Sequence, residues 1–164
     1  MRSAVALVTA GFLASCFMSD REMTGAPVAS DIVGKCFALT SESMRIRFPF
    51  SKVDLLFADM DGRLQNDVAL QKRMELRIMG TVPKGSPLIV SRVLDSFNGE
   101  TARRWDVFAT LRDPNGTAVE VQIPTYSGVD QGWLVEWRSD ATRESGKAVQ
   151  FKDKYLTPCA VATP

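Results

Sequence analysis

The side chains available for chemistry in this 164-residue chain are limited in kind, and histidine is missing altogether. Without histidine, a Ser/His/Asp triad, a Cys/His pair and a histidine-ligated metal site are all excluded. The three cysteines have other roles, argued below, so a thiol nucleophile is not expected. Catalysis would therefore depend on carboxylates, and the segment that draws attention is VDLLFADMDG, residues 53–62.

This segment is an apolar stretch that ends in an Asp-x-Asp-Gly sequence, and it resembles the first motif of haloacid-dehalogenase phosphatases. The resemblance implies a magnesium-dependent phosphohydrolase in which Asp59 is the phosphoryl-accepting nucleophile and Asp61 is the general acid. The chain departs from the motif at Arg63, where that family usually has Thr or Val. The residues that follow predict β-hairpins instead of the βα units of a parallel sheet, so the phosphohydrolase is kept only as the enzyme alternative.

A calcium loop is the other chemical interpretation of the same segment. With Gly62 at the turn position, Phe57 and Val68 occupy the places of the first and last carboxylates. We therefore interpret the segment as a solvated turn between β elements. We expect a protein that is not an enzyme and needs no cofactor or metal.

The elements that must position any functional residue begin with the N-terminal segment. Residues 3–15 carry no charge but are too few for the roughly 20 apolar residues of a membrane-spanning helix. With Arg2 before them, they form the pattern of a secretory signal peptide, residues 1–15. The ending Leu13-Ala14-Ser15-Cys16 resembles the lipobox of bacterial lipoproteins, which implies cleavage before Cys16 and its acylation.

The resemblance implies an anchor in a membrane without a spanning helix, since acyl chains on one residue bury enough CH₂ groups to hold the protein there. In enterobacterial lipoproteins an Asp after the cysteine favours retention at the inner membrane, whereas Phe17 follows here. We therefore expect the periplasmic face of the outer membrane of a bacterial cell envelope. The alternative is an ordinary secreted protein whose Cys16 falls there by chance.

The cysteine count agrees with export, because three cysteines would leave one free thiol in an oxidising compartment. Lipidation of Cys16 removes the odd one. Cys36 and Cys159 then remain, and the periplasm would allow them to form a disulfide bond between the two ends of the folded region. The alternative is two unrelated buried thiols.

The charge of the mature chain is balanced, because cleavage removes Arg2 and leaves 19 basic side chains against 19 acidic ones. A nucleic-acid binder needs a basic excess, so none is expected. About 149 residues are enough for one domain. We predict a flexible tether over residues 16–31, a single β-rich domain over 32–159 and a tail over 160–164.

Alternation of apolar and polar residues predicts strands through most of this domain. The segment 44–48 alternates Met, Ile and Phe with two arginines, and 88–94 forms a second strand. Every second residue from Trp105 to Leu111 and from Val119 to Ile123 is apolar, and the two runs flank Asp113-Pro114-Asn115-Gly116, which predicts an antiparallel hairpin. Trp133, Val135 and Trp137 alternate with Leu134, Glu136 and Arg138, and residues 149–155 predict a last strand towards Cys159. Residues 66–78 fit either a strand or a short helix.

These patterns predict an all-β fold, a small antiparallel barrel or sandwich with at most one or two short helices, placed between residues 54 and 78. Within it, residues 80–111 are similar to the opening of bacterial SH3-like domains, in which a Pro-Lys-Gly turn precedes a β-branched strand and a tryptophan opens the next. The resemblance implies an SH3-like barrel. No ligand groove is carried over from it.

Candidate binding residues are arginines and tryptophans on the predicted strands. The arginines either recognise an anionic partner or form a solvated strand face. The tryptophans either pack in the core, which we favour, or anchor a partner. The set is Arg45, Arg47, Arg103, Arg104, Trp105, Trp133 and Trp137.

We expect a lipid-anchored periplasmic module that holds, assembles or inhibits another envelope protein. Small β-rich lipoproteins with a disulfide resemble periplasmic lysozyme inhibitors and toxin-neutralising immunity proteins, which are the alternative. The partner itself is not identified by any motif.

Overall fold

Strands are the main regular elements of the computed structural model, which describes residues 19–58, 68–73, 75–97, 102–112, 115–125 and 132–159. The elements are β1 (Ser19–Glu22), a 3-10 turn η1 (Pro27–Ala29), β2 (Cys36–Leu39), β3 (Ser43–Arg47), β4 (Asp54–Phe57), α2 (Val68–Arg73), β5 (Arg77–Val82), β6 (Pro87–Phe97), β7 (Arg104–Arg112), β8 (Ala118–Ile123), α3 (Ser139–Ser145) and β9 (Leu156–Pro158). The predicted all-β class with two short helices is confirmed. The described part of the chain has no helix long and apolar enough to span a bilayer.

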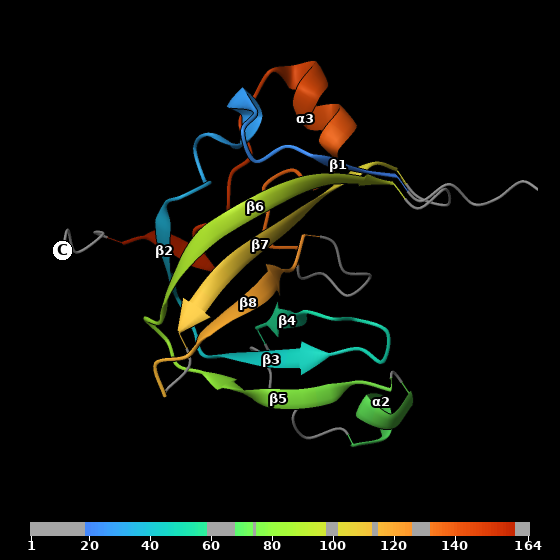
Figure 1. Cartoon of the computed structure of the whole chain (residues 1–164), viewed down its shortest axis with the longest axis vertical. Coiled ribbons are helices and arrows are strands. Elements are labelled where there is room, and N and C mark those ends of the chain that lie inside the picture. Colours follow the sequence, from blue (N-terminus) through green and yellow to red (C-terminus); the bar gives the residue numbers. More distant parts are fainter. Residues whose placement is uncertain are drawn as a thin grey trace, which may run out of the picture.

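The described strands form one curled sheet in the order β5-β3-β4-β8-β7-β6-β2-β9, and β1 pairs with the free side of β6 (Figure 1). Neighbouring strands are antiparallel except β4 and β8, which run parallel. The result is a half-barrel with β6 and β7 crossing over its middle. This accords with the predicted small barrel, whereas the SH3-like assignment stays a prediction.

The sheet curls because two long segments of the chain, residues 36–47 and 77–89, pair with each other and bend together. Cys36 in β2 faces Ile89 in β6, and Ser43 in β3 faces Val82 in β5, so moving seven residues along one segment moves seven residues back along the other. Residues 36–47 and 77–89 are therefore one antiparallel ribbon, which keeps a single register up to the pair Arg45–Gly80 and then shifts by one residue at a β-bulge. The ribbon bends at the turn around Gly85, whose N–H donates to Leu39 O at 2.8 Å. This bend carries the chain from one half of the sheet to the other.

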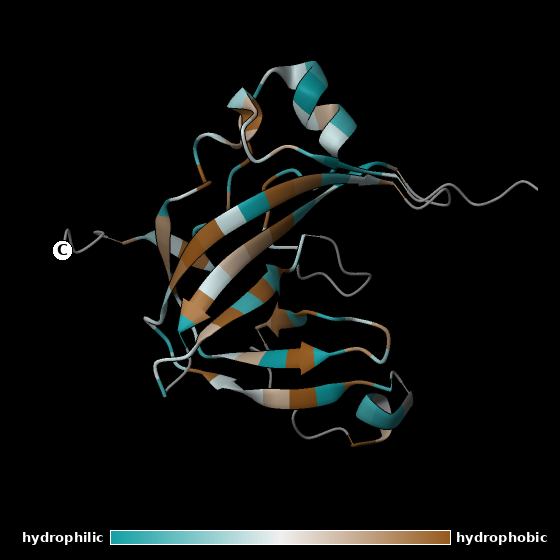
Figure 2. Ribbon diagram, viewed as in Figure 1, coloured by the Kyte–Doolittle hydropathy of each residue, from teal (hydrophilic) through white to brown (hydrophobic). Residues whose placement is uncertain are grey.

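The main core lies inside the curl. Trp105, Val107, Ala109 and Leu111 of β7 face inward and are almost fully buried, as the alternation predicted. Apolar and polar residues alternate along the long strands in Figure 2. The β7–β8 hairpin is confirmed, and Gly116 supplies the positive φ of 82° near its turn. The turn residues 113 and 114 lie outside the described residues.

The predicted tether is wrong for the described part of its range. β1 pairs with the last four residues of β6, from Ser19 opposite Phe97 to Glu22 opposite Leu94. Met23 and Ala29 then belong to the main core, with 8% and 0% of their surface exposed. The sequence of this segment shows no apolar periodicity. The segment is held instead by backbone pairing with the free edge of β6 and by the burial of a few of its side chains. Cys16, with the rest of residues 1–18, lies outside the described residues.

Three further expectations are corrected or resolved. The ambiguous segment 66–78 contains both elements, since α2 ends at Arg73 and β5 begins at Arg77. Residues 133–137 do not form a strand; Leu134 makes an isolated bridge to Phe151 and is buried, whereas Val135 is 61% exposed. Helix α3 follows this segment, outside the range where helices were expected. The last strand, β9, is confined to residues 156–158.

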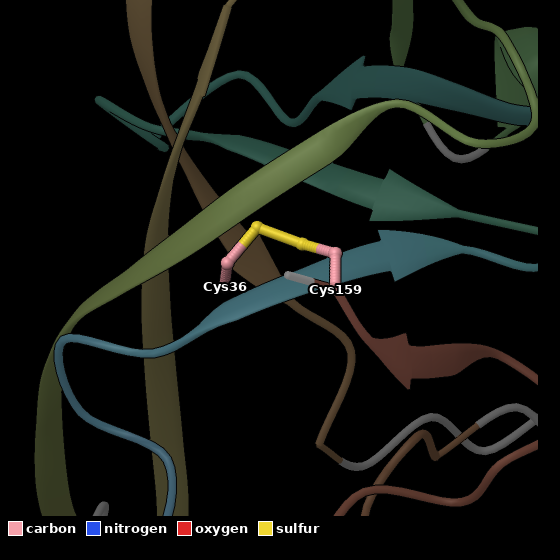
Figure 3. The surroundings of a disulfide bond; sticks show 2 residues. All are labelled: Cys36 and Cys159. Atoms are coloured by element: carbon pink, nitrogen blue, oxygen red, sulfur yellow. A yellow bond between two sulfur atoms is a disulfide. The ribbon is translucent and has the colours of Figure 1, made fainter. Parts of the chain in front are cut away.

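The predicted disulfide is confirmed. Cys36 opens β2 and Cys159 follows β9, and their Sγ atoms are bonded with a Cα–Cα separation of 5.4 Å (Figure 3). The N–H of Cys159 also donates to Cys36 O at 3.1 Å. The bond therefore joins segments 123 residues apart at one edge of the sheet.

Candidate functional site

Arg45 and Arg47 lie on the inner face of the curled sheet, not on a solvated outer face. Arg45 faces Leu56 across the β3–β4 pair, and Leu56 is fully buried in the main core. Because alternate residues of a strand point to opposite faces, Arg47 and Asp54 lie on the same inner face. The apolar residues of β3 point the other way.

Those apolar residues form a separate small cluster. Met44 and Ile46 pack with Leu76, and the partly buried Phe48, Leu55 and Phe57 lie against them. The alternation along β3 is therefore as predicted, but its apolar face does not contribute to the main core. A buried carboxylate on the neighbouring strand explains how the arginine-bearing face of β3 can lie on the inner side of the sheet.

That carboxylate is Asp54, whose side chain is 1% exposed. Its Oδ1 accepts a hydrogen bond from Arg47 Nε at 2.7 Å, and its Oδ2 lies 3.7 Å from Arg45 Nη1. A buried ion needs such partners, because burial without them costs several kcal/mol. Two arginines share one carboxylate, so the group keeps an excess positive charge.

Arg45 is held in an extended position with unused hydrogen-bonding capacity. Its Nη2 donates to Met79 O over a long 3.4 Å, and it lies across Gly80, where an added Cβ would meet Nη2 at 3.6 Å. The guanidinium carries five N–H donors, and only these weak contacts engage Nη1 and Nη2 among the described residues. Its side chain is 17% exposed.

The exposed side of Arg45 opens into a small cavity of about 150 Å³, which we call the basic cavity. Arg112, at the end of β7, lies on its wall and donates from Nη1 to Gly116 O at 3.3 Å. At roughly 30 Å³ per water molecule, the cavity has room for a carboxylate-sized group, not for a drug-sized ligand. Its walls are Arg45, Thr81, Val82, Pro83, Ser86, Leu111 and Arg112.

Ser43 adds a second unusual feature to this inner face. It lies two residues before Arg45, is 1% exposed, and its Oγ has no hydrogen-bond partner among the described residues. Buried hydroxyl groups are normally paired. The inner face of β3 therefore carries both spare positive charge and an unpaired polar atom.

The other predicted arginines are at the opposite end of β6. Arg103 Nε donates to both carboxylate oxygens of Asp95, at 2.9 and 3.1 Å, and Asp95 is fully buried. Arg143 and Ser139 from α3 donate to the same carboxylate. Arg104 pairs with Asp106 at 3.3 Å. The network of Asp95, Arg103 and Arg143 holds α3 against the sheet, whereas the Arg104 pair lies within β7.

An exposed ion pair lies beside this group. Arg138 Nη2 and Asp140 Oδ2 are 2.7 Å apart. The hydrogen bond from Arg138 lowers the pKa of Asp140 from 3.8 to about 2. Arg104 and Arg138 each have their own carboxylate, whereas Arg103 and Arg143 share Asp95 at 2.9 Å each. At the basic cavity, in contrast, the contacts of Arg45 are long, 3.7 Å to Asp54 and 3.4 Å to Met79 O.

The three predicted tryptophans differ in how far they are buried. Trp105 and Trp133 are fully buried, so they are core residues and not binding contacts. Trp105 Nε1 donates to Thr142 Oγ1 at 3.0 Å, and Trp133 stacks on Tyr155 with ring centroids 5.2 Å apart. Trp137 is half-buried and its carbonyl accepts from Trp105 N at 3.0 Å.

A second depression lies beside the Asp95 group, with Arg143 on its wall. It has a volume of about 370 Å³ and runs between residues 23–28 and helix α3, with Met23, Pro27 and Val28 on one side and Thr142, Lys147 and Ala148 on the other. The arginine on its wall is already held at 2.9 Å by the carboxylate of Asp95. We therefore regard the basic cavity as the better candidate site.

Sequence reasoning found Arg45 and Arg47 but missed three residues that define their surroundings. Asp54 is only seven residues from Arg47 but meets the β3 arginines through the β3–β4 pairing, and Arg112, far along the sequence, meets Arg45 only through the curl of the sheet. Gly80 carried no signal beyond being a glycine in a strand. Asp59 and Asp61 lie outside the described residues, and the sheet around β4 is antiparallel apart from its pairing with β8.

Comparison with known proteins gives no relative for this chain: no family model, no curated protein and no solved structure matches it.

Proposed function

We propose that this protein is a lipid-anchored module of the bacterial cell envelope that binds an acidic side chain of a partner protein in the basic cavity. The observation that carries the proposal is the sharing of one buried carboxylate by Arg45 and Arg47, which leaves spare donors beside Arg112. A carboxylate of a partner would complete this arrangement, since guanidinium groups bind carboxylates through paired N–H donors.

The size of the cavity supports a protein partner over a small-molecule substrate. Enclosed ligand sites are typically about 300–1,000 Å³ and largely apolar, whereas this cavity is about 150 Å³ and has two arginines on its walls. A single acidic residue fits it, and the surrounding surface would provide the rest of the interface. An anchor on the same membrane as the partner raises the effective concentration, so a modest interface is sufficient.

The envelope location is supported by the lipobox resemblance at Cys16 and by the disulfide, which forms in oxidising compartments. Anchoring is tested by Cys16→Ser. The parent protein should incorporate palmitate and partition with membranes, and the variant should be soluble or unprocessed. Equal membrane partitioning of the two forms would refute the anchor.

The binding site is tested with an acidic hexapeptide and the purified mature domain. We expect the peptide to shift the Arg45 Nε–Hε resonance in NMR spectra, with an affinity that falls as salt is raised. Arg112→Gln should weaken binding, and it leaves the Asp54 ion pairs intact. Arg92→Gln is the control, because Arg92 pairs with Glu120 on the outer face. Equal loss in both variants would refute the site.

Photocrosslinking in cells tests whether a partner protein occupies the cavity. A photocrosslinking residue at Ser86, on the cavity wall, should capture an envelope protein in the parent and in Arg92→Gln, and much less of it in Arg112→Gln. The enzyme alternative predicts a magnesium-dependent phosphatase activity that is abolished by Asp59→Asn with Asp61→Asn. Finding that activity would replace the binding-module proposal.

A further inference from the structure

The anchor proposed at Cys16 is separated from the folded domain by very little chain. β1 begins at Ser19, so only Phe17 and Met18 lie between the acylated residue and a strand that is paired with β6. Three extended residues reach roughly 10 Å at most. A domain held by so short a link cannot turn freely above a bilayer.

We propose, on the basis of the proposed lipidation, that the end of the domain where β1 begins lies against the phospholipid headgroups and that the basic cavity points away from the membrane. The contact end comprises Ser19, Phe97, Arg103, Trp137 and Arg138. These residues come from four separate segments, and the link places all of them at the bilayer surface.

Contacts between those segments define this end. Ser19 pairs with Phe97, and Arg103 Nη1 lies 3.5 Å from Ser19 Oγ. The Arg103 guanidinium also lies 5.9 Å from the centre of the Phe97 ring. Residue 138 bridges to residue 104, at the start of β7. Figure 1 shows β1, the end of β6 and the start of β7 meeting at one end of the sheet.

The basic cavity lies at the other end of β6. Leu111 on its wall pairs with Leu88, and β6 continues from there to Phe97. At about 3.3 Å per residue this part of the strand spans roughly 30 Å, shortened somewhat by its curvature. A partner can therefore reach the cavity without competition from the bilayer.

The link, and not electrostatic attraction, holds the contact end in place. The two arginines of the contact end are both engaged in ion pairs, Arg103 with Asp95 and Arg138 with Asp140, so neither is an unpaired cation for anionic lipids. Half-buried aromatic residues such as Phe97 and Trp137 suit the headgroup region, where aromatic rings are enriched. The apposition should accordingly depend little on the lipid charge.

The test uses lipidated full-length protein reconstituted into phosphatidylcholine vesicles, with a benzophenone amino acid at one of two exposed positions. Arg138→benzoylphenylalanine should crosslink to phospholipid at least about fivefold more than Lys84→benzoylphenylalanine, because Lys84 is in the turn next to the cavity. A Gly/Ser spacer of about 20 residues between Met18 and Ser19 adds roughly 25 Å of mean reach and should remove most of this difference.

The outcomes separate the two proposals. Protein that carries palmitate and sediments with vesicles, but crosslinks equally at both positions or more at Lys84, overturns the orientation and leaves the anchor intact. Crosslinking at Arg138 that survives the spacer, or that requires phosphatidylglycerol, overturns the role of the link. Protein without palmitate overturns the anchor and the orientation together.

Discussion

Arg143 and Asp95 lie 48 residues apart in the sequence and 2.9 Å apart in the structure, where Arg143 Nη1 donates to Asp95 Oδ2. The other carboxylate oxygen accepts hydrogen bonds from Arg103 Nε and Ser139 Oγ. One buried carboxylate thus joins β6, the start of β7 and helix α3. The three donors replace the water that Asp95 loses on burial.

We predict that Asp95→Asn lowers the free energy of unfolding by about 2–3 kcal/mol. The amide keeps the shape of the side chain but loses the charge that pairs with Arg103 and Arg143; both arginines are partly exposed and regain some water, which limits the loss. Urea unfolding of the mature domain measures the change. Asp153→Asn, at an exposed position, is the matched control and should change stability little. Similar effects of the two substitutions would show that the network is not stabilising.

The packing of Met23 tests whether the segment before β2 belongs to the domain. Met23→Ala should cost about 2–3 kcal/mol, because it removes a side chain that is 92% buried from the main core. Arg21→Ala, two residues earlier on exposed β1, should cost less than about 0.5 kcal/mol. Thermal and urea unfolding give both values. If Met23→Ala behaved like Arg21→Ala, the segment would be a tether after all.

The disulfide should make a large contribution to stability. It closes a loop between residues 123 positions apart, and the loss of chain entropy in the unfolded state is worth up to about 5 kcal/mol for a loop of this length. We expect Cys36→Ser with Cys159→Ser to lower the urea midpoint markedly, and reduction of the parent protein to have the same effect. The denatured, unreduced mature protein should contain no free thiol at these two positions. Labelling of either one would contradict the bond.

The Arg138–Asp140 pair predicts a pH-dependent contribution. The pKa of Asp140 is lowered from 3.8 to about 2 in the folded protein. A lowered pKa means that the stabilisation is complete above the unfolded value and disappears as the pH falls through about 2. Carboxyl NMR titration should give a midpoint near 2 for Asp140, and Arg138→Gln should return it towards 3.8. High salt should reduce the difference, because the pair is exposed. A midpoint that is insensitive to Arg138→Gln would exclude the pair as the cause.

The sequence by itself determined most of the antiparallel strands β6, β7 and β8, and the disulfide. Along β7 every second residue from Trp105 to Leu111 is apolar and faces the core, because the register of a strand with one face in the core is fixed by its apolar residues; Phe108 lies on the other face, under Arg92. The cysteines were predictable by number, since in an exported chain only Cys36 and Cys159 remain to pair once Cys16 is lipidated.

The tertiary structure decided which face of β3 turns inward. The sequence shows an apolar face and an arginine face, and solvation alone would put the arginines outside. Asp54 reverses this, because β3 and β4 pair in a register that places its buried carboxylate opposite Arg47 on the inner face, where it pairs with the partly exposed arginine. That register depends on the turn between the strands and is invisible in either strand alone.

Long-range strand pairing likewise decided that residues 19–29 are ordered and which residues line the basic cavity. The N-terminal segment has weak local preference and becomes ordered structure because the last residues of β6 leave an edge free for β1. Arg45 and Arg112 are 67 positions apart in the sequence and meet at the cavity only because the ribbon of residues 36–47 and 77–89 bends and brings β3 under the end of β7. Local patterns specify which strands form, whereas the curvature of the sheet determines which side chains from distant strands share a site.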